Sequence, residues 1–162
     1  MIKPASEGGK ERSETLTHPI SIGKGEIRAT VEPLGWENEF FQIDSGKLNF
    51  SSSAPALTLD ALNAFTLTQA KIAAGNLVLA DALADLGFRL VEGEIDLSLP
   101  LQRTTVVTPL PRWREAAPDD IPALRDAASR VFALSRFRSP WYQPEDSGRF
   151  YAQWIENAVR GT

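Results

Sequence analysis

The sequence predicts an α/β protein built from two units, and three observations support this prediction. Apolar and polar residues alternate with the strand period of two at 26–32 and again at 89–99. Between these segments, 77–87 and a shorter run before it carry the spacing of amphipathic helices. A proline-bounded stretch, 100–111, precedes a fresh strand-and-helix start at Arg114, so we expect the boundary between the units near residue 101.

Composition and charge limit the class of protein. The chain has 162 residues, of which 43% are hydrophobic and 23% charged, as is typical of soluble globular chains. Its net charge of -4 argues against a nucleic-acid binder. The absence of cysteine excludes disulfides and thiolate catalysis, and the single histidine, His18, disfavours a metal site. Because no apolar run approaches the roughly 18 residues of a membrane span and no signal peptide is present, we expect a cytoplasmic protein with no membrane span.

The N-terminal part of the chain changes character at residue 26. Residues 1–25 are rich in glycine and polar side chains, and we expect an unstructured leader there. The alternation at 26–32 predicts a half-buried strand that ends at Pro33. A weaker second strand is expected at 47–50.

Two helices and an aromatic cluster follow from local signals in this unit. Thr58 is expected to be the N-cap of one helix, and Gly87 to end another. Trp36, Phe40 and Phe41 lie close together in a polar connector. They could line a ligand cleft or plug the end of a sheet, and we favour the plug.

The alternation over 89–99 predicts a strand with an apolar face of Val91, Ile95, Leu97 and Leu99. Three carboxylates, Glu92, Glu94 and Asp96, lie on its other face. Such a row could bind a divalent cation or supply a general base with a raised pKa. It could instead be a solvated sheet face. We favour the solvated face because no histidine or further acidic cluster completes a coordination site.

The second unit is predicted to begin with a short strand at Arg114 and a helix capped by Asp119 or Asp120, with Pro122 in its first turn. The two aspartates could be a catalytic pair, but helix capping explains both. The buried stripe of this helix is expected to contain Ile121, Leu124, Ala128 and Val131.

The loop after that helix carries the strongest functional signal. Arg136, Arg138 and Arg149 are interleaved with aromatic residues, a composition suited to a nucleotide-linked ligand because guanidinium groups bind phosphate and aromatic faces stack on bases. The loop could equally be a packed segment whose arginines are solvated or paired with Glu145 and Asp146. The aromatic residues are Phe137, Trp141, Tyr142 and Phe150.

The last predicted helix runs over 148–160 and ends at Gly161. Its aromatic stripe is more typical of a core than of a cofactor site. The sequence contains no G-x-S-x-G elbow, no Walker loop and no G-x-G-x-x-G fingerprint, so motifs alone name no reaction. The stripe consists of Tyr151, Trp154, Ile155 and Ala158.

Several segments resemble one family, the GNAT-type N-acetyltransferases that modify dTDP-fucosamine in enterobacterial common antigen synthesis. The resemblance covers Ile27 to Thr162 almost continuously. The segments that carry it are TVEPL at 30–34, WENEFF at 36–41, AKIAA at 70–74, LGFRLVEGEIDLSLP at 86–100 and SRFRSPWYQPEDSGRFYAQWIENAVRGT at 135–162.

This resemblance implies an enzyme that transfers acetyl from acetyl-CoA to the 4-amino group of a dTDP-4-amino-4,6-dideoxyhexose, without a metal and as a homodimer in the full-length family. It also implies a domain plan. After the leader at 1–25, residues 26–101 would be a partial GNAT-like domain, and 102–162 would be the first strand and two helices of a truncated GNAT acetyltransferase domain.

The chain departs from the family pattern on the donor side. GNAT enzymes hold the CoA pyrophosphate on an R/Q-x-x-G-x-G/A turn, and this sequence contains none. The family's catalytic tyrosine would lie beyond Thr162, so we assign no catalytic residue. The loop between the first two GNAT helices commonly walls the acceptor pocket. The resemblance therefore makes Arg136, Arg138, Tyr142 and Arg149 the candidate substrate-binding residues.

Two expectations follow for the chain as given. It should neither bind acetyl-CoA nor turn over by itself, and the alternative is a non-catalytic α/β module that binds a partner. Because one strand and two amphipathic helices cannot cover their own apolar faces, the second unit should also expose its stripe and self-associate.

Overall fold

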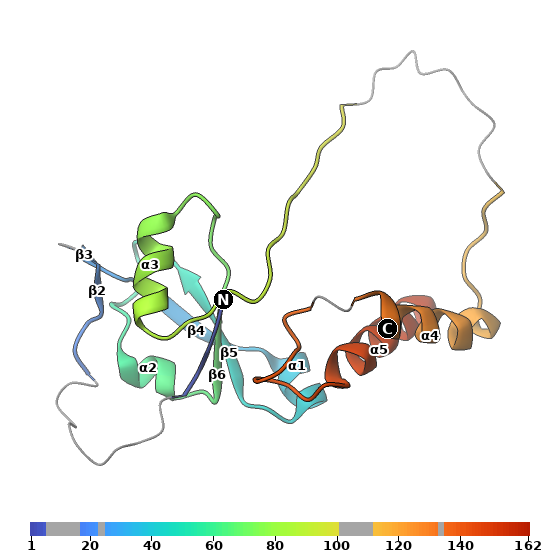
Figure 1. Ribbon diagram of the computed structural model, residues 1–162, viewed down its shortest axis with the longest axis horizontal. Coiled ribbons are helices and arrows are strands. Elements are labelled where there is room, and N and C mark those ends of the chain that lie inside the picture. Colours follow the sequence, from blue (N-terminus) through green and yellow to red (C-terminus); the bar gives the residue numbers. More distant parts are fainter. Residues whose placement is uncertain (6–16, 23–24, 101–111, 133–134) are drawn as a thin grey trace. The chain divides into compact units, whose positions relative to one another are not determined.

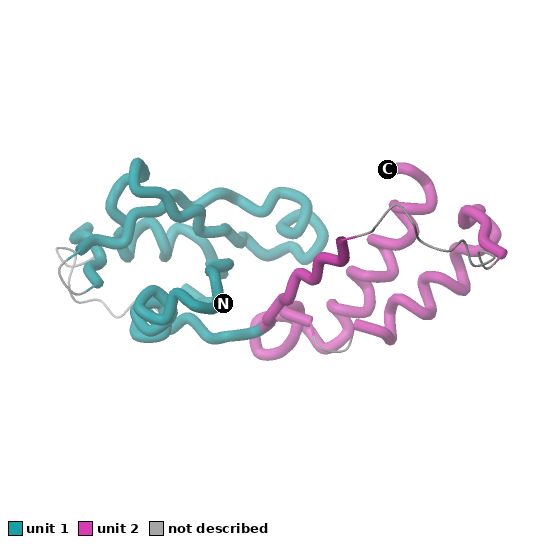
Figure 2. The backbone as a smooth tube through the Cα atoms, turned by 90° about the horizontal axis from the view of Figure 1, so that it is seen from above, with its two compact units in different colours: residues 1–91 teal, residues 92–162 magenta. Residues whose placement is uncertain are grey.

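The computed structural model describes residues 1–5, 17–22, 25–100, 112–132 and 135–162. They form two compact units, 1–91 and 92–162, coloured separately in Figure 2. The division falls earlier in the sequence than the boundary expected near residue 101. Residues 101–111 of the proline-bounded stretch lie outside the described part of the chain.

The first unit is organised around a four-stranded mixed sheet (Figure 1). In spatial order its strands are β1 (Ile2–Pro4), β6 (Leu67–Ala70), β5 (Ser45–Phe50) and β4 (Ala29–Pro33). The two outer pairs are antiparallel, while β5 and β6 run parallel and are joined by a crossover that contains α2 (Leu59–Asn63). β2 (Ser21–Ile22) and β3 (Gly25–Glu26) form a separate two-stranded ladder.

The sheet and the helices around it bury one apolar core. The strand expected at 26–32 is confirmed over Ala29–Pro33, and Ala29 faces the core with 3% of its surface exposed. The weaker strand expected at 47–50 is confirmed as part of β5. The core cluster contains Ile27, Ala29, Leu48, Leu57, Leu62, Ala70, Leu83 and Phe88.

Local cap signals placed the helices of this unit correctly. The Thr58 hydroxyl accepts a hydrogen bond from the Ala61 backbone N–H at 3.2 Å, which makes Thr58 the N-cap of α2. α3 (Leu77–Asp85) is followed by Gly87, whose φ of +90° is a backbone conformation that favours glycine. Gly87 therefore ends the helix as predicted.

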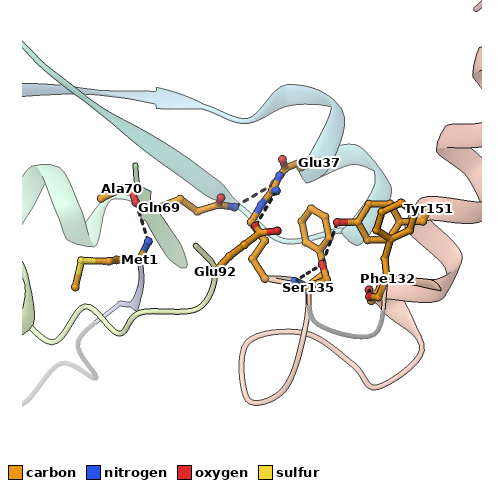
Figure 3. A network of polar contacts seen from close by, with 11 residues as sticks. Met1, Glu37, Gln69, Ala70, Glu92, Phe132, Ser135 and Tyr151 are labelled. Atoms are coloured by element: carbon orange, nitrogen blue, oxygen red, sulfur yellow. Dashed lines mark hydrogen bonds and ion pairs between the residues drawn. The ribbon is translucent and has the colours of Figure 1, made fainter. Parts of the chain in front are cut away.

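The expectation of an unstructured leader is wrong at both ends of residues 1–25. Ile2 is fully buried, and the Met1 α-amine donates to the Ala70 carbonyl oxygen at 2.7 Å (Figure 3). Pro19 also bridges to Thr58. β6 offers a free edge and the core offers an apolar site, so even a short segment gains enough contacts to be ordered. Residues 6–16 and 23–24 lie outside the described part.

The strand predicted over 89–99 is also wrong. Arg89 makes a single bridge to Ile2, and the rest of the segment has no regular structure. Ile95 and Leu97, expected on the buried face, are 85% and 92% exposed. Alternation favours a strand only where a sheet edge runs alongside for pairing, and the edge strand β1 has only three residues and meets this segment at Arg89 alone.

Because there is no strand at 89–99, Glu92, Glu94 and Asp96 do not form a row on a sheet face. Neither the cation-binding nor the solvated-sheet interpretation therefore applies in its original form. Across the described ranges, no three His, Cys, Asp or Glu side chains are grouped so that they could hold a metal ion.

The aromatic trio lies on a helix, α1 (Gly35–Phe41), rather than in a connector. Trp36 stacks on Phe40 with 5.7 Å between ring centroids, and Phe40 meets Phe41 edge-on at 4.9 Å. Trp36 is 43% exposed and no residue of α1 is fully buried, so the trio is a partly exposed cluster and not a buried plug.

The second unit is a helix pair. A 3-10 turn, η1 (Pro118–Asp120), leads into α4 (Ile121–Val131), which packs along α5 (Asp146–Arg160). The short strand predicted at Arg114 is wrong, because residues 112–117 form no strand. The stripe predicted for α4 is right at Ile121, which is buried, and wrong at Val131, which is 71% exposed.

The sequence predicts where α5 ends, but the residues that α5 buries are not those of the predicted stripe. Gly161 adopts φ +74° and ends the helix as expected. Trp154, assigned to the apolar stripe that this unit was expected to leave uncovered, is 53% exposed, whereas Phe150 and Ala152, which lie outside that stripe, are buried. The mixed α/β class is confirmed by both units together. No helix within the described residues is long and apolar enough to cross a membrane.

Candidate functional site

The best candidate for a functional surface is the loop from Ser135 to Glu145, which connects α4 to α5; we call it the arginine loop. It contains Arg136 and Arg138, and the first turns of α5 add Arg149. Residues 133–134 lie outside the described part, so the loop is described from Ser135 onward.

The inner side of the arginine loop is an aromatic cluster. Phe137 is 1% exposed and meets Tyr142 edge-on, with 5.3 Å between ring centroids. Phe137 also packs against Phe150 at 4.3 Å. These aromatic rings form a small core beside the first turns of α5. Because they bury a large aromatic area, they hold the loop against that helix.

A buried serine joins this cluster to the next turn of α5. Ser135 is 1% exposed, its hydroxyl lies 3.3 Å from the Tyr151 hydroxyl, and it accepts the Phe137 backbone N–H at 3.2 Å (Figure 3). Tyr151 in turn stacks on Phe132 at 4.1 Å. These contacts provide hydrogen-bond partners for the buried Ser135 hydroxyl and the Phe137 N–H. They also restrict the conformation of the start of the loop.

The middle of the loop is a tight turn centred on Arg138. Its carbonyl oxygen accepts the backbone N–H groups of both Trp141 and Tyr142, each at 3.2 Å. The turn contains the Ser139–Pro140 cis peptide. The backbone of Arg138 is therefore tied directly to that of Trp141.

A buried carboxylate fixes the end of the loop. Asp146 is 4% exposed, and its Oδ2 accepts the Gln143 backbone N–H at 2.9 Å. Its Oδ1 accepts Nη1 of Arg149 at 2.8 Å. The pairing of an arginine with Asp146, one of the two alternatives for this loop, is thus present for Arg149, while Glu145 pairs with no arginine among the described residues.

The three arginines have different surroundings. Arg136 is half-buried, with its Cζ 4.3 Å from the Phe137 ring centroid and its Nη1 3.6 Å from Glu92 Oε2. Arg149 pairs with Asp146. Arg138 is exposed, donates from Nη1 to the Ser139 carbonyl oxygen at 3.1 Å, and has its Cζ 5.0 Å from the Trp141 ring centroid.

The structure therefore separates the four candidate residues. Tyr142 is 4% exposed and belongs to the aromatic cluster, so it supports the loop from inside. The three arginines differ in exposure, with Arg136 half-buried and Arg138 and Arg149 exposed or partly exposed. Sequence reasoning missed Ser135, since a serine beside a helix end gives no signal that distinguishes a buried anchor from a solvated residue.

A hollow of about 360 Å³ lies in the first unit between β2 and α3. Its lining is mostly aliphatic, with Asp81 and Asp85 of α3 as its two carboxylates. Two negative charges oppose the binding of a phosphate-bearing ligand. For a nucleotide-linked ligand, the arginine loop is the better candidate.

The comparison with known proteins decides which family the chain resembles. A dTDP-fucosamine acetyltransferase of Escherichia coli O6:H1 is 56% identical over 136 residues, which are 84% of this chain. This chain is similar to dTDP-fucosamine acetyltransferase. The resemblance drawn from the sequence segments is thereby confirmed. No family model matches the chain.

The extent of the match is as informative as its identity. The chain spans 59% of the length of that dTDP-fucosamine acetyltransferase. The acetyltransferase activity in the relative's name therefore belongs to a protein that contains substantial sequence outside the matched part.

Proposed function

We propose that this chain supplies the acceptor-binding part of a nucleotide-sugar N-acetyltransferase. The reaction would transfer acetyl from acetyl-CoA to the 4-amino group of a dTDP-4-amino-4,6-dideoxyhexose. The observation that carries the proposal is the 56% identity to a dTDP-fucosamine acetyltransferase. A cytoplasmic location and a homodimeric full-length enzyme are part of the same proposal.

The proposal includes a domain plan. Residues 26–101 correspond in it to a partial GNAT-like domain, and 102–162 to the opening of a GNAT acetyltransferase domain. The division of the described residues into units 1–91 and 92–162 supports two parts, with a boundary earlier than the plan places it.

The acceptor side is assigned to the arginine loop. The diphosphate of a dTDP-sugar carries the negative charge that guanidinium groups bind best, and Arg136, Arg138 and Arg149 bring three of them to one region of the second unit. Tyr142 supports them from the aromatic cluster. No residue of the chain is assigned a catalytic role.

The donor side does not fit the described residues of the second unit. A CoA pyrophosphate binds best at a helix N-terminus with free backbone N–H groups. Here α4 follows Asp119 and Asp120, and α5 begins at Asp146 directly after Glu145, so carboxylates occupy both helix starts. With no Gly-rich turn in the sequence, acetyl-CoA is expected to require residues that this chain does not contain.

The overall chemistry balances without a metal. The amine nitrogen of the sugar forms an amide bond to the acetyl carbonyl carbon while the thioester C–S bond breaks. The proton lost by the amine leaves with CoA as its thiol.

A chimera tests the proposed function. It joins this chain to the part of the E. coli relative that the chain does not match, and acetyl transfer from labelled acetyl-CoA to dTDP-4-amino-4,6-dideoxygalactose is measured. We expect the chimera to acetylate this acceptor and the 162-residue chain alone to show no turnover. A dTDP-sugar without an amino group is the matched acceptor control, and the relative itself is the positive control.

Two results would contradict parts of the proposal. A folded chimera that binds acetyl-CoA but leaves the amino sugar unmodified would remove the assigned reaction. Clear one-to-one binding of acetyl-CoA by the chain alone, in calorimetric titration, would remove the argument that its donor site is missing.

The alternative function, a non-catalytic partner-binding module, is supported by one observation. The second unit exposes large apolar side chains, among them Trp154 and Val131, and such surfaces commonly bind proteins. An inactive chimera together with a protein partner captured through these residues would favour the module.

A further inference from the structure

We infer that Arg138 and Trp141 together form the nucleotide-recognition surface of the arginine loop, with the Trp141 indole stacking on thymine and the Arg138 guanidinium binding the diphosphate. This inference rests on the proposed function, and it deepens that proposal by naming the residues that contact the dTDP portion of the acceptor.

The first argument is the availability of Arg138. A guanidinium has five N–H donors, and within the described residues that of Arg138 has one hydrogen-bond acceptor, the Ser139 carbonyl oxygen at 3.1 Å. Arg149 already pairs with Asp146 at 2.8 Å, and Arg136 lies 3.6 Å from Glu92. A diphosphate would therefore meet less competition from carboxylates at Arg138 than at the other two arginines.

The second argument is the geometry of the pair. The Arg138 Cζ lies 5.0 Å from the Trp141 ring centroid, within the distance at which a cation and an aromatic face attract each other. A planar base needs an aromatic face, and a diphosphate needs a cation close to it. Arg138 and Trp141 bring both groups to one turn of the chain.

The third argument is that the turn is already fixed. The Arg138 carbonyl oxygen accepts the N–H groups of Trp141 and Tyr142, each at 3.2 Å, so the two recognition residues are held by one turn. Tyr142 anchors that turn in the aromatic cluster by its edge-on contact with Phe137. A ligand that binds such a surface orders few additional side chains, which reduces the entropic cost of binding.

These contacts give Tyr142 a positioning role. Its ring lies in the aromatic cluster, and its backbone N–H holds the turn that carries Arg138. It is therefore not expected to touch the nucleotide itself.

The test follows the indole N–H signals of the 162-residue chain by ¹⁵N NMR while dTDP is added. The chain has four tryptophans, and the Trp141→Phe variant assigns the relevant signal by its loss. Thymidine, dTMP and inorganic pyrophosphate are titrated separately. We expect dTDP to shift the Trp141 signal in a saturable way, and to bind more tightly than any of these three fragments.

Matched variants test the role of the guanidinium. Arg138→Gln is expected to weaken dTDP binding by about tenfold or more, because a charge-assisted contact to phosphate is lost. Arg130→Gln is the control, since Arg130 is an exposed arginine of α4 that pairs with Asp126. Its affinity for dTDP should equal that of the parent chain. Unchanged signals from the Phe137 and Tyr142 rings confirm that Arg138→Gln remains folded.

Several results would overturn the inference. They are an absence of dTDP binding, a saturable shift that leaves the Trp141 signal in place, unaltered affinity in Arg138→Gln, or pyrophosphate binding as tight as dTDP. The last result would describe an anion site without base recognition.

The chimera separates this inference from the proposed function. If it acetylates the amino sugar and Arg138→Gln leaves its KM unchanged, the nucleotide surface is wrong and the reaction stands. If dTDP binds at Trp141 but a folded chimera transfers no acetyl, the surface stands and the reaction is wrong.

Discussion

At the scale of single residues, two aspartates start the two helices of the second unit in the same way. Asp120 Oδ2 accepts the backbone N–H of Ala117 at 2.8 Å, and Asp146 Oδ2 accepts that of Gln143 at 2.9 Å. Each aspartate lies three residues after its donor, and each donor is followed by a proline. A carboxylate at this position satisfies a backbone donor before the helix begins. Asp120 is the N-cap residue of α4, as one of the two sequence alternatives had it, but its side chain bonds back to Ala117 and not to the first turn of α4.

The surroundings of Asp120 predict how stability depends on pH. The Arg114 guanidinium, which donates to both carboxylate oxygens at 2.6 and 2.7 Å, and then the Ala117 N–H hold the pKa of Asp120 well below its ordinary value. A pKa that is lower in the folded state makes a stabilising contribution that is present above the unfolded pKa of about 3.9 and is lost as the pH falls further.

Asp120→Asn should therefore lower the midpoint of urea unfolding at pH 7, followed by circular dichroism at 222 nm. The difference from the parent chain should shrink as the pH is lowered below about 4, because Asp120 of the unfolded parent chain takes up a proton there while the folded chain still holds it as a carboxylate. Asp119→Asn is the control, since Asp119 is an exposed neighbour on the same turn. Equal losses in the two variants at pH 7 would show that the Arg114 contact contributes nothing.

At the scale of elements, local sequence signals predicted correctly the helix caps and helix ends, which depend only on residues close in the sequence. The Thr58 cap and the Gly87 and Gly161 ends were predictable because each acts within one helical turn. Pairing could not be predicted in the same way. Ile2 lies opposite Gln69 in the sheet, and no periodicity within residues 1–25 indicates so distant a partner.

The candidate site shows the same division between local and tertiary information. Composition indicated that arginines and aromatics share one loop, and the structure has Arg136, Arg138 and Trp141 there but Arg149 and Phe150 on α5. Composition could not distinguish Tyr142, buried against Phe137, from Trp141, which lies beside Arg138, because burial depends on where α5 packs.

A pair of isoleucines tests the two largest corrections to the predicted elements. Ile2 was expected in a leader and is fully buried, while Ile95 was expected on a buried strand face and is 85% exposed. Ile2→Ala should lower the free energy of unfolding by about 2–4 kcal/mol, because it leaves a cavity in the core. Ile95→Ala should change it by less than about 0.5 kcal/mol. Urea unfolding of both variants gives the comparison, and a reversed order would contradict the placement of β1.

At the scale of the whole molecule, the two units differ in how well they cover their apolar residues. The first unit encloses a connected core that draws on strands and helices. The second is a helix pair whose buried apolar residues gather around the arginine loop. Helix pairs of this kind cover only one side of each helix, so the opposite sides remain open to solvent or to another protein.

The open sides of α4 and α5 predict self-association. Val131 is 71% exposed, Phe132 42% and Trp154 53%, while the net charge of -4 on 162 residues provides only weak repulsion between copies. In sedimentation velocity, the apparent mass should rise above the 17.8 kDa of one chain as the concentration increases. Trp154→Ser should move this rise to higher concentration. Trp113→Ser should not, because Trp113 is 75% exposed but lies outside both helices. A parent chain that stays monomeric at every concentration would mean that these side chains do not form an adhesive surface.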